Sequence, residues 1–246
     1  MLTAHPIASR ILRFFFPENC GRCRFPLRGG ERFVCQGCWE KIERIGGAVC
    51  PRCGSPFAST YALASSPGHL CEPCRVEVLP FAAARAVGWY RGALREVIHL
   101  FKYEGKMGLG PRLGALMADH LPGLFSLDRP WDEVLSVPLH RKRLKEREFD
   151  QSLILAQGLS RRYQIPLSWG NLVRTRWTNP QVGLNKEERR RNVQGAFALR
   201  KPDWVAGRQL LLIDDVYTTG ATILECCRIL QAAGAARVDV YTLARA

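Results

Sequence analysis

The chain has 246 residues, of which 47% are hydrophobic and 24% charged, and its formal net charge at pH 7 is +14. The first two values are ordinary for a globular protein. No apolar run approaches the roughly 20 residues of a membrane span, and the N-terminal ILRFFF lacks the apolar region and cleavage site of a signal peptide. We therefore expect a cytoplasmic protein without a membrane span, whose positive charge suits phosphate compounds or nucleic acid.

Four CxxC pairs precede residue 75 and use eight of the ten cysteines. Two CxxC turns that point at one spot complete a tetrahedral Cys₄ zinc site. Because CGRCRFP is repeated as CPRCGSP, tandem pairing is favoured over a cross-brace. A closed Cys₄ site leaves no position for a reactive water, so we expect two structural zinc ions. The tandem ligand sets are Cys20, Cys23, Cys35 and Cys38 for one ion, and Cys50, Cys53, Cys71 and Cys74 for the other.

Residues 1–78 are expected to form this double zinc-ribbon module, including a short N-terminal helix, and residues 79–246 a second domain. The aromatic residues Phe25, Phe33 and Trp39 are expected in the core of the module.

Strands and helices alternate along the second domain. Alternating or continuous apolar residues predict strands at 82–90, 132–138, 171–175, 209–214 and 236–244. Helical spacing covers 91–106, 108–121, 149–163 and 218–235. The polar, basic segment 178–197 is a poor core candidate, and we interpret it as a mobile loop with a short helix. This order predicts an α/β fold with an open, mainly parallel sheet flanked by helices, whose ligands bind at the carboxyl ends of the strands.

A pair of carboxylates, Asp214 and Asp215, ends one apolar strand, and TTGAT (218–222) leads into the next helix. Gly220 lets backbone amides approach a ligand, and the helix N-terminus supplies unpaired N–H groups. The loop lacks the lysine of a P-loop, so it suits one phosphate and not a Walker-type nucleotide site. Adjacent carboxylates suit the vicinal hydroxyls of a ribose, directly or through Mg²⁺. The pattern therefore predicts a site for a phosphorylated sugar.

The stretch LLLIDDVYTTGAT (210–222) resembles the phosphoribosyl-pyrophosphate (PRPP) motif of type I phosphoribosyltransferases. The resemblance implies that Asp214 and Asp215 contact the ribose as catalytic residues. Members that use 6-oxopurines carry an acid at the place of Thr218, so such a substrate is not expected. The implied 5′-phosphate ligands are Thr218, Thr219, Gly220, Ala221 and Thr222.

Almost the full chain resembles the ComF family of ComFC and GntX-like proteins, in which a zinc-ribbon module precedes a phosphoribosyltransferase domain. Besides the CxxC pairs and the PRPP motif, the shared segments are FKYEGK (101–106), VPLHRKRLKEREFDQ (137–151) and 178–197. Lys102 and Tyr103 match the family pattern, although no role follows for them from the residues. Glu148 stands where the family commonly has glycine, which leaves the geometry of that turn open, and Asp150 is a second departure.

Two basic segments carry expectations of their own. The resemblance transfers the pyrophosphate-binding loop to Pro138, Leu139 and His140, with Arg143 and Arg147 nearby. Cations there would stabilise a departing polyanion. KEERRRN (186–192) lies where this fold class carries a lid. Its lid or DNA-binding candidates are Arg189, Arg190 and Arg191, for which an exposed helical face is an equal alternative.

Three functions remain open at this point. The first is Mg²⁺-dependent phosphoribosyl transfer from PRPP to an unidentified acceptor, and the second is a PRPP sensor without turnover. The third is a purely DNA-binding adaptor, because the resemblance implies a part in natural competence, with single-stranded DNA and competence-machinery proteins such as a DNA translocase as partners. For a single strand, the aromatic stacking candidates near the basic stretch are Tyr163, Trp169 and Trp177.

Overall fold

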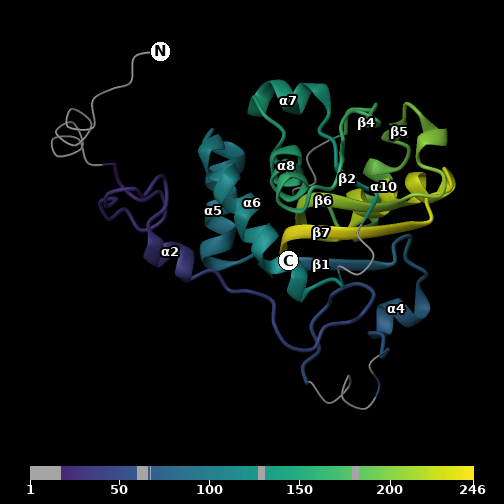
Figure 1. Ribbon diagram of the computed structural model, residues 1–246, viewed down its shortest axis with the longest axis horizontal. Helices are drawn as coiled ribbons and strands as arrows, with labels where there is room; N and C mark the ends of the chain where they lie inside the picture. Colours follow the sequence, from purple (N-terminus) through teal and green to yellow (C-terminus); the bar gives the residue numbers. More distant parts are fainter. Residues whose placement is uncertain (1–17, 60–65, 67, 127–130, 179–182) are drawn as a thin grey trace.

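The computed structural model describes residues 18–59, 66, 68–126, 131–178 and 183–246. Its centre is a five-stranded parallel sheet with the strand order β1-β7-β6-β2-β3 (Figure 1). The expected open parallel sheet is thus confirmed, while the expected short N-terminal helix lies outside the described residues. The strands are β1 (Ala83–Trp89), β2 (Glu133–Ser136), β3 (Leu167–Ser168), β6 (Gln209–Tyr217) and β7 (Arg237–Arg245).

Helices cover both faces of the sheet because alternate strand residues point to opposite sides. Leu211 and Ile213 of β6 pack in one apolar cluster with three helices, whereas Leu210 and Leu212 belong to a second cluster. The helices of the first cluster are α5 (Gly92–Tyr103), α6 (Gly110–His120) and α8 (Gln151–Tyr163), and that of the second is α10 (Ala221–Ala232). Cys226 and Cys227 of α10 are fully buried, as expected for structural thiols.

A small second sheet lies beside α10. It pairs β4 (Leu172–Arg174) with β5 (Phe197–Leu199) in antiparallel fashion, and α9 (Lys186–Val193) connects the two strands. The interpretation of segment 178–197 as a poor core candidate was wrong for its end, where Val193, Ala196 and Phe197 are buried. The polar average of the segment hides these apolar residues, which belong to the same cluster as α10.

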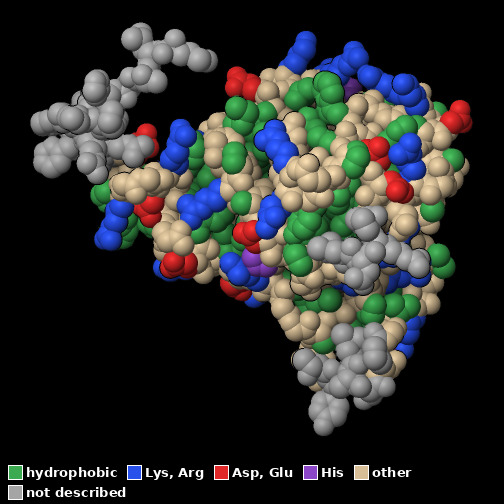
Figure 2. Space-filling model, viewed as in Figure 1, with side chains coloured by type: hydrophobic (Ala, Val, Ile, Leu, Met, Phe, Trp, Pro, Cys, Tyr) green, Lys and Arg blue, Asp and Glu red, His purple; other side chains and the backbone are tan. Residues whose placement is uncertain are grey.

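Short elements connect the main ones. One of them, α7 (Arg141–Arg147), follows β2 and has no buried residue. Lys and Arg side chains gather over α7 at the top of Figure 2. The described residues also form three single 3₁₀ turns, η1 (Met107–Leu109), η2 (Leu121–Gly123) and η3 (Pro202–Trp204). In the described part of the chain, no helix has the length and apolar character needed to cross a bilayer.

The cysteine-rich segment packs directly on the α/β layers. It contains α2 (Gln36–Glu40) and α4 (Glu72–Val76). Trp39 is buried and Phe33 packs against the first cluster, as expected, but Phe25 is 72% exposed and that expectation was wrong.

The chain from Glu43 to Arg52, which leads from the first cysteine group into the second, runs along β1, an edge strand of the sheet. Trp89 N donates to Glu43 O at 3.0 Å, and Ala84 N donates to Arg52 O at 2.7 Å. Because these bonds satisfy the outer side of β1, the edge is covered instead of being open to another chain.

Candidate functional site

A cavity of about 680 Å³ opens where the strands end. Its walls come from the loops after β2 and β6 and from α5, α7, α8, β4 and α9. Segments that are distant in sequence therefore meet there, as the rule for open α/β sheets predicts. The expected site residues that line it are Pro138, Leu139, Arg143, Arg147, Arg189, Asp214, Asp215, Thr218 and Thr222.

The paired acids are held by three different hydrogen bonds. Ser152 Oγ donates to Asp214 Oδ1 at 2.8 Å, and the amide of Asp215 donates to the same oxygen at 2.9 Å. Lys102 Nζ lies 2.8 Å from Asp215 Oδ2, and both side chains are largely buried. This contact gives Lys102 the structural partner that the sequence left undefined.

The charges in this cluster shift one another's pKa. Burial, together with the charge of Asp215, raises the pKa of Asp214 to about 7. Burial opposes a charge on Lys102, but the attraction of Asp215 outweighs it, so the pKa of Lys102 is raised. Asp214 therefore takes up a proton more readily than an ordinary aspartate, while Lys102 stays cationic.

The loop from Thr218 to Thr222, called the cradle below, contains the expected phosphate ligands. Thr218 and Thr222 line the cavity, whereas Thr219, Gly220 and Ala221 are not among its lining residues. Gly220 has φ +75° and is the N-cap residue of α10, and a Cβ there would lie 2.5 Å from the Tyr217 hydroxyl oxygen. The first amides of α10 have no partner within the helix, as at every helix N-terminus. Thr219 Oγ1 is buried and has no hydrogen-bond partner among the described residues. A phosphate oxygen would satisfy both kinds of donor.

The loop after β2 is fixed by the residues that follow it. His140 Nδ1 accepts a hydrogen bond from Lys142 N at 3.2 Å, so His140 caps α7 and is not among the residues that line the cavity. Asp150 accepts from Leu153 N at 3.0 Å and from Leu139 N at 3.4 Å. The departure at Asp150 thus caps α8 and ties the loop to it. Glu148 adopts φ +65°, which explains why a glycine suits this turn.

An arginine wall, formed by Arg143, Arg147, Arg174 and Arg189, lines the same cavity as the acids. Arg189 Nη1 donates to Thr218 Oγ1 at 3.3 Å and so connects α9 with the cradle. Arg174 was missed by the sequence reasoning, since a single arginine in a three-residue strand gives no signal. Burial, followed by nearby Arg143, lowers its pKa.

The other two arginines of the expected lid lie elsewhere. Arg190 and Arg191 are exposed, and Arg191 pairs with Glu187 on the same helix at 3.1 Å. For these two, the alternative of an exposed helical face fits the structure.

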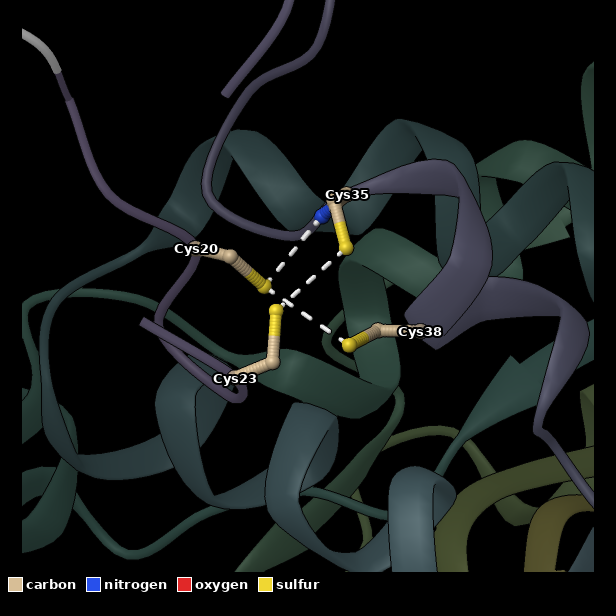
Figure 3. Close-up of side chains that lie close together, drawn as sticks. All are labelled: Cys20, Cys23, Cys35 and Cys38. Atoms are coloured by element: carbon tan, nitrogen blue, oxygen red, sulfur yellow. Dashed lines mark hydrogen bonds between the residues drawn. The ribbon is translucent and has the colours of Figure 1, made fainter. Parts of the chain in front are cut away.

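The eight CxxC cysteines form two groups in tandem, and in each group the sulfur atoms lie within 4.8 Å of one another. Figure 3 shows the first, in which Cys20 Sγ lies 3.8 Å from Cys38 Sγ. In the second, Cys53 Sγ lies 3.5 Å from Cys71 Sγ. A tetrahedral zinc with bonds of about 2.3 Å separates its sulfur ligands by about 3.8 Å. The residues therefore fit two zinc ions, one for each group.

The second cysteine group is connected to the cradle through the last strand. Arg245 of β7 donates from Nη1 to Cys53 O and from Nη2 to Ser55 Oγ, each at 2.7 Å. The same guanidinium lies 4.7 Å from the ring centroid of Tyr217, which packs beneath Gly220. A chain of direct contacts thus runs from the zinc ribbon to the cradle.

Comparison with known proteins agrees with this organisation. Residues 11–75 match the double zinc ribbon domain, and residues 150–246 match the phosphoribosyl transferase domain. The fold and the two cysteine sites define a protein of the phosphoribosyltransferase class that carries a double zinc ribbon.

Two curated relatives cover nearly the whole chain. DNA utilization protein YhgH of Escherichia coli O157:H7 is 34% identical over 93% of this chain and 97% of its own length. Competence protein ComFC of Bacillus subtilis is 31% identical over 94% of this chain and 91% of its own length. The chain belongs to the ComF family. Among solved structures, adenine phosphoribosyl transferase from Trypanosoma brucei is similar over 58% of this chain and 55% of its own, with 16% identity and a TM-score of 0.37.

Proposed function

We propose that this protein binds PRPP with Mg²⁺ in the cavity and transfers its phosphoribosyl group to an acceptor in the course of DNA utilisation. One observation supports the proposal: the paired acids, the cradle and the arginine wall all contribute residues to one cavity of about 680 Å³. Each of these three parts suits a different piece of PRPP.

The 5′-phosphate fits the cradle. The amides of the first turn of α10 would donate to it, and the buried hydroxyl of Thr219 would gain the acceptor that it lacks. The ribose hydroxyls fit Asp214 and Asp215, which both face the cavity. Charged acceptors bind hydroxyls more strongly than neutral ones.

The pyrophosphate fits the arginine wall. In the transfer, the bond between ribose C1 and the pyrophosphate oxygen breaks and its electron pair leaves with pyrophosphate. The acceptor forms a new bond to C1 with its own electron pair and releases its proton to water. Fixed cations that meet the developing negative charge lower the barrier of such a step. Mg²⁺, bound with the substrate and held by Asp214 or Asp215, would add further neutralisation of the leaving group.

A pyrophosphate-release assay separates the enzyme from the sensor. The protein, PRPP and Mg²⁺ are incubated with free bases, nucleosides and single-stranded oligonucleotides as acceptors, and released pyrophosphate is measured. Release that depends on one acceptor and disappears in the Asp214→Asn/Asp215→Asn double variant supports transfer. PRPP binding without pyrophosphate release for any acceptor would support a sensor without turnover.

A DNA-binding role is the second candidate. It is favoured by the net charge of +14 and by the names of the relatives, which refer to DNA utilization and competence. A role confined to DNA binding predicts that the Asp214→Asn/Asp215→Asn variant keeps full function, so the same variant distinguishes the two candidates.

A further inference from the structure

A second hollow, of about 310 Å³, is formed where β3 leads into β4 and where β5 leads through η3 towards β6. Its lining residues are Ser168, Trp169, Gly170, Asn171, Arg200, Lys201 and Trp204. None of them lines the PRPP cavity, so the hollow is separate from it.

An exposed tryptophan forms part of this hollow. Trp169 is 78% exposed, and no other aromatic side chain in the described part of the chain is as exposed. Gly170 follows it with φ +79°, a conformation that favours glycine and turns the chain sharply after Trp169. Burial of an indole ring is strongly favourable, and an exposed ring does not gain this free energy. An exposed tryptophan is therefore a candidate contact for a partner.

The walls of the hollow are tied together by the backbone. Arg200 N donates to Asn171 O at 2.9 Å, and Lys201 N donates to Asn171 Oδ1 at 2.8 Å. Asn171 Nδ2 donates in turn to Lys201 O at 3.3 Å. The two loops are therefore joined by three hydrogen bonds, which fix the backbone that carries the two cations relative to the backbone at Asn171.

The chemistry of the walls combines aromatic rings with cations. Arg200, Lys201 and Trp204 line the hollow together with Trp169. Within the described ranges, neither Arg200 nor Lys201 takes part in an ion pair. Arg208 lies 4.7 Å from the ring centroid of Trp204, but it also pairs with Glu133 at 3.4 Å, so the cations of the hollow itself are Arg200 and Lys201.

We infer that this hollow binds single-stranded DNA, with a base stacked on Trp169 and the neighbouring phosphates beside Arg200 and Lys201. An accessible ring can stack only on a base that is not already stacked and paired in a duplex, and the two cations match the charge of the backbone. A volume of about 310 Å³ is at the lower end of ligand sites and is large enough for one base with its sugar. The inference rests on the DNA-related part of the proposed function and does not require PRPP binding.

The test measures binding of a fluorescein-labelled oligothymidylate to the full-length protein by fluorescence anisotropy. The oligonucleotide has about 15 nucleotides, the size of one single-strand site. Trp169→Ala is expected to weaken binding about five- to a hundredfold, and Trp169→Phe to retain most of it, because a base can stack on either ring. Since Trp169 is exposed, neither change should affect folding.

The charge pair is tested with a matched control. Arg200→Ala/Lys201→Ala should reduce the slope of log affinity against log salt by roughly 1.4, the value for two phosphate contacts on a single strand. Arg161→Ala/Arg162→Ala removes the same charge from the exposed end of α8 and should leave the slope nearly unchanged.

Three outcomes would overturn the inference. The first is an unchanged oligonucleotide affinity in Trp169→Ala. The second is an equal change of the salt slope in Arg200→Ala/Lys201→Ala and in Arg161→Ala/Arg162→Ala. The third is no binding of the oligonucleotide by the wild type. PRPP calorimetry on the same variants distinguishes this failure from that of the proposed function, because Trp169→Ala should bind PRPP as the wild type does. A protein that loses oligonucleotide binding but keeps PRPP binding supports the inference.

Discussion

Lys102 of α5 and Asp215 of β6 form a largely buried ion pair of 2.8 Å at the mouth of the site. The lysine neutralises one of two adjacent carboxylates that would otherwise repel each other. In the absence of ligand, it therefore keeps the acid pair in place.

The first prediction follows from this pair. Lys102→Met should destabilise the protein by about 3–5 kcal/mol at pH 7, since it leaves a buried carboxylate without its partner. Urea denaturation measures the loss. Lys102→Met/Asp215→Asn should recover most of it, whereas no recovery in the double variant would show that the lysine acts through packing alone.

A second prediction concerns pH. The pKa of Asp214 is raised to about 7 from an ordinary value of 3.8, so the folded state favours its protonated form. The associated stability is fully present below about pH 4 and is lost as the pH rises through 7. Melting temperatures measured from pH 5 to 8 should therefore fall more in the wild type than in Asp214→Asn. Parallel curves for the two proteins would contradict the raised pKa.

The cradle gives a third prediction. Gly220→Ala should cost about 1–2 kcal/mol for the left-handed backbone and should also abolish binding of ribose 5-phosphate, because its Cβ would collide with Tyr217. Gly207→Ala is the matched control: its φ is +73°, but no atom lies within 4 Å of the added Cβ. The control should lose only the cost of the left-handed backbone and should keep ligand binding. If Gly220→Ala still binds ribose 5-phosphate, the phosphate does not bind at this loop.

The departure at Glu148 gives a fourth prediction. Glu148→Gly should stabilise the protein by about 1 kcal/mol, because glycine adopts φ +65° without the steric cost that a side chain meets. Lys145→Gly, inside α7, should instead cost about 1 kcal/mol. Both values come from urea denaturation, and a loss of stability in Glu148→Gly would mean that the glutamate side chain makes a contact of its own.

Features encoded in one continuous stretch were predictable from the sequence. The strand ending in Asp214 and Asp215, the cradle and α10 follow one another in the chain, and the CxxC repeat indicated the tandem cysteine groups that the structure confirms. Lys102 and Arg174 could not be placed in this way. Their positions depend on where the tertiary structure brings α5 and the β4–β5 sheet relative to the end of β6.

Short elements and local averages account for the remaining differences. β3 and β5 have two and three residues, too few for a period to be visible. Phe25 is exposed although aromatic residues are usually covered, and Val193 and Phe197 are buried within a segment that is polar on average.

The central claim, that the acid pair and the cradle hold one molecule of PRPP, is tested most directly by calorimetry of PRPP with Mg²⁺. The account predicts saturable heat with one PRPP per wild-type chain, and roughly a hundredfold weaker binding in Asp214→Asn/Asp215→Asn, which loses charged acceptors for the ribose. The absence of heat in a folded, zinc-loaded wild-type protein, or equal affinity in the double variant, would contradict it.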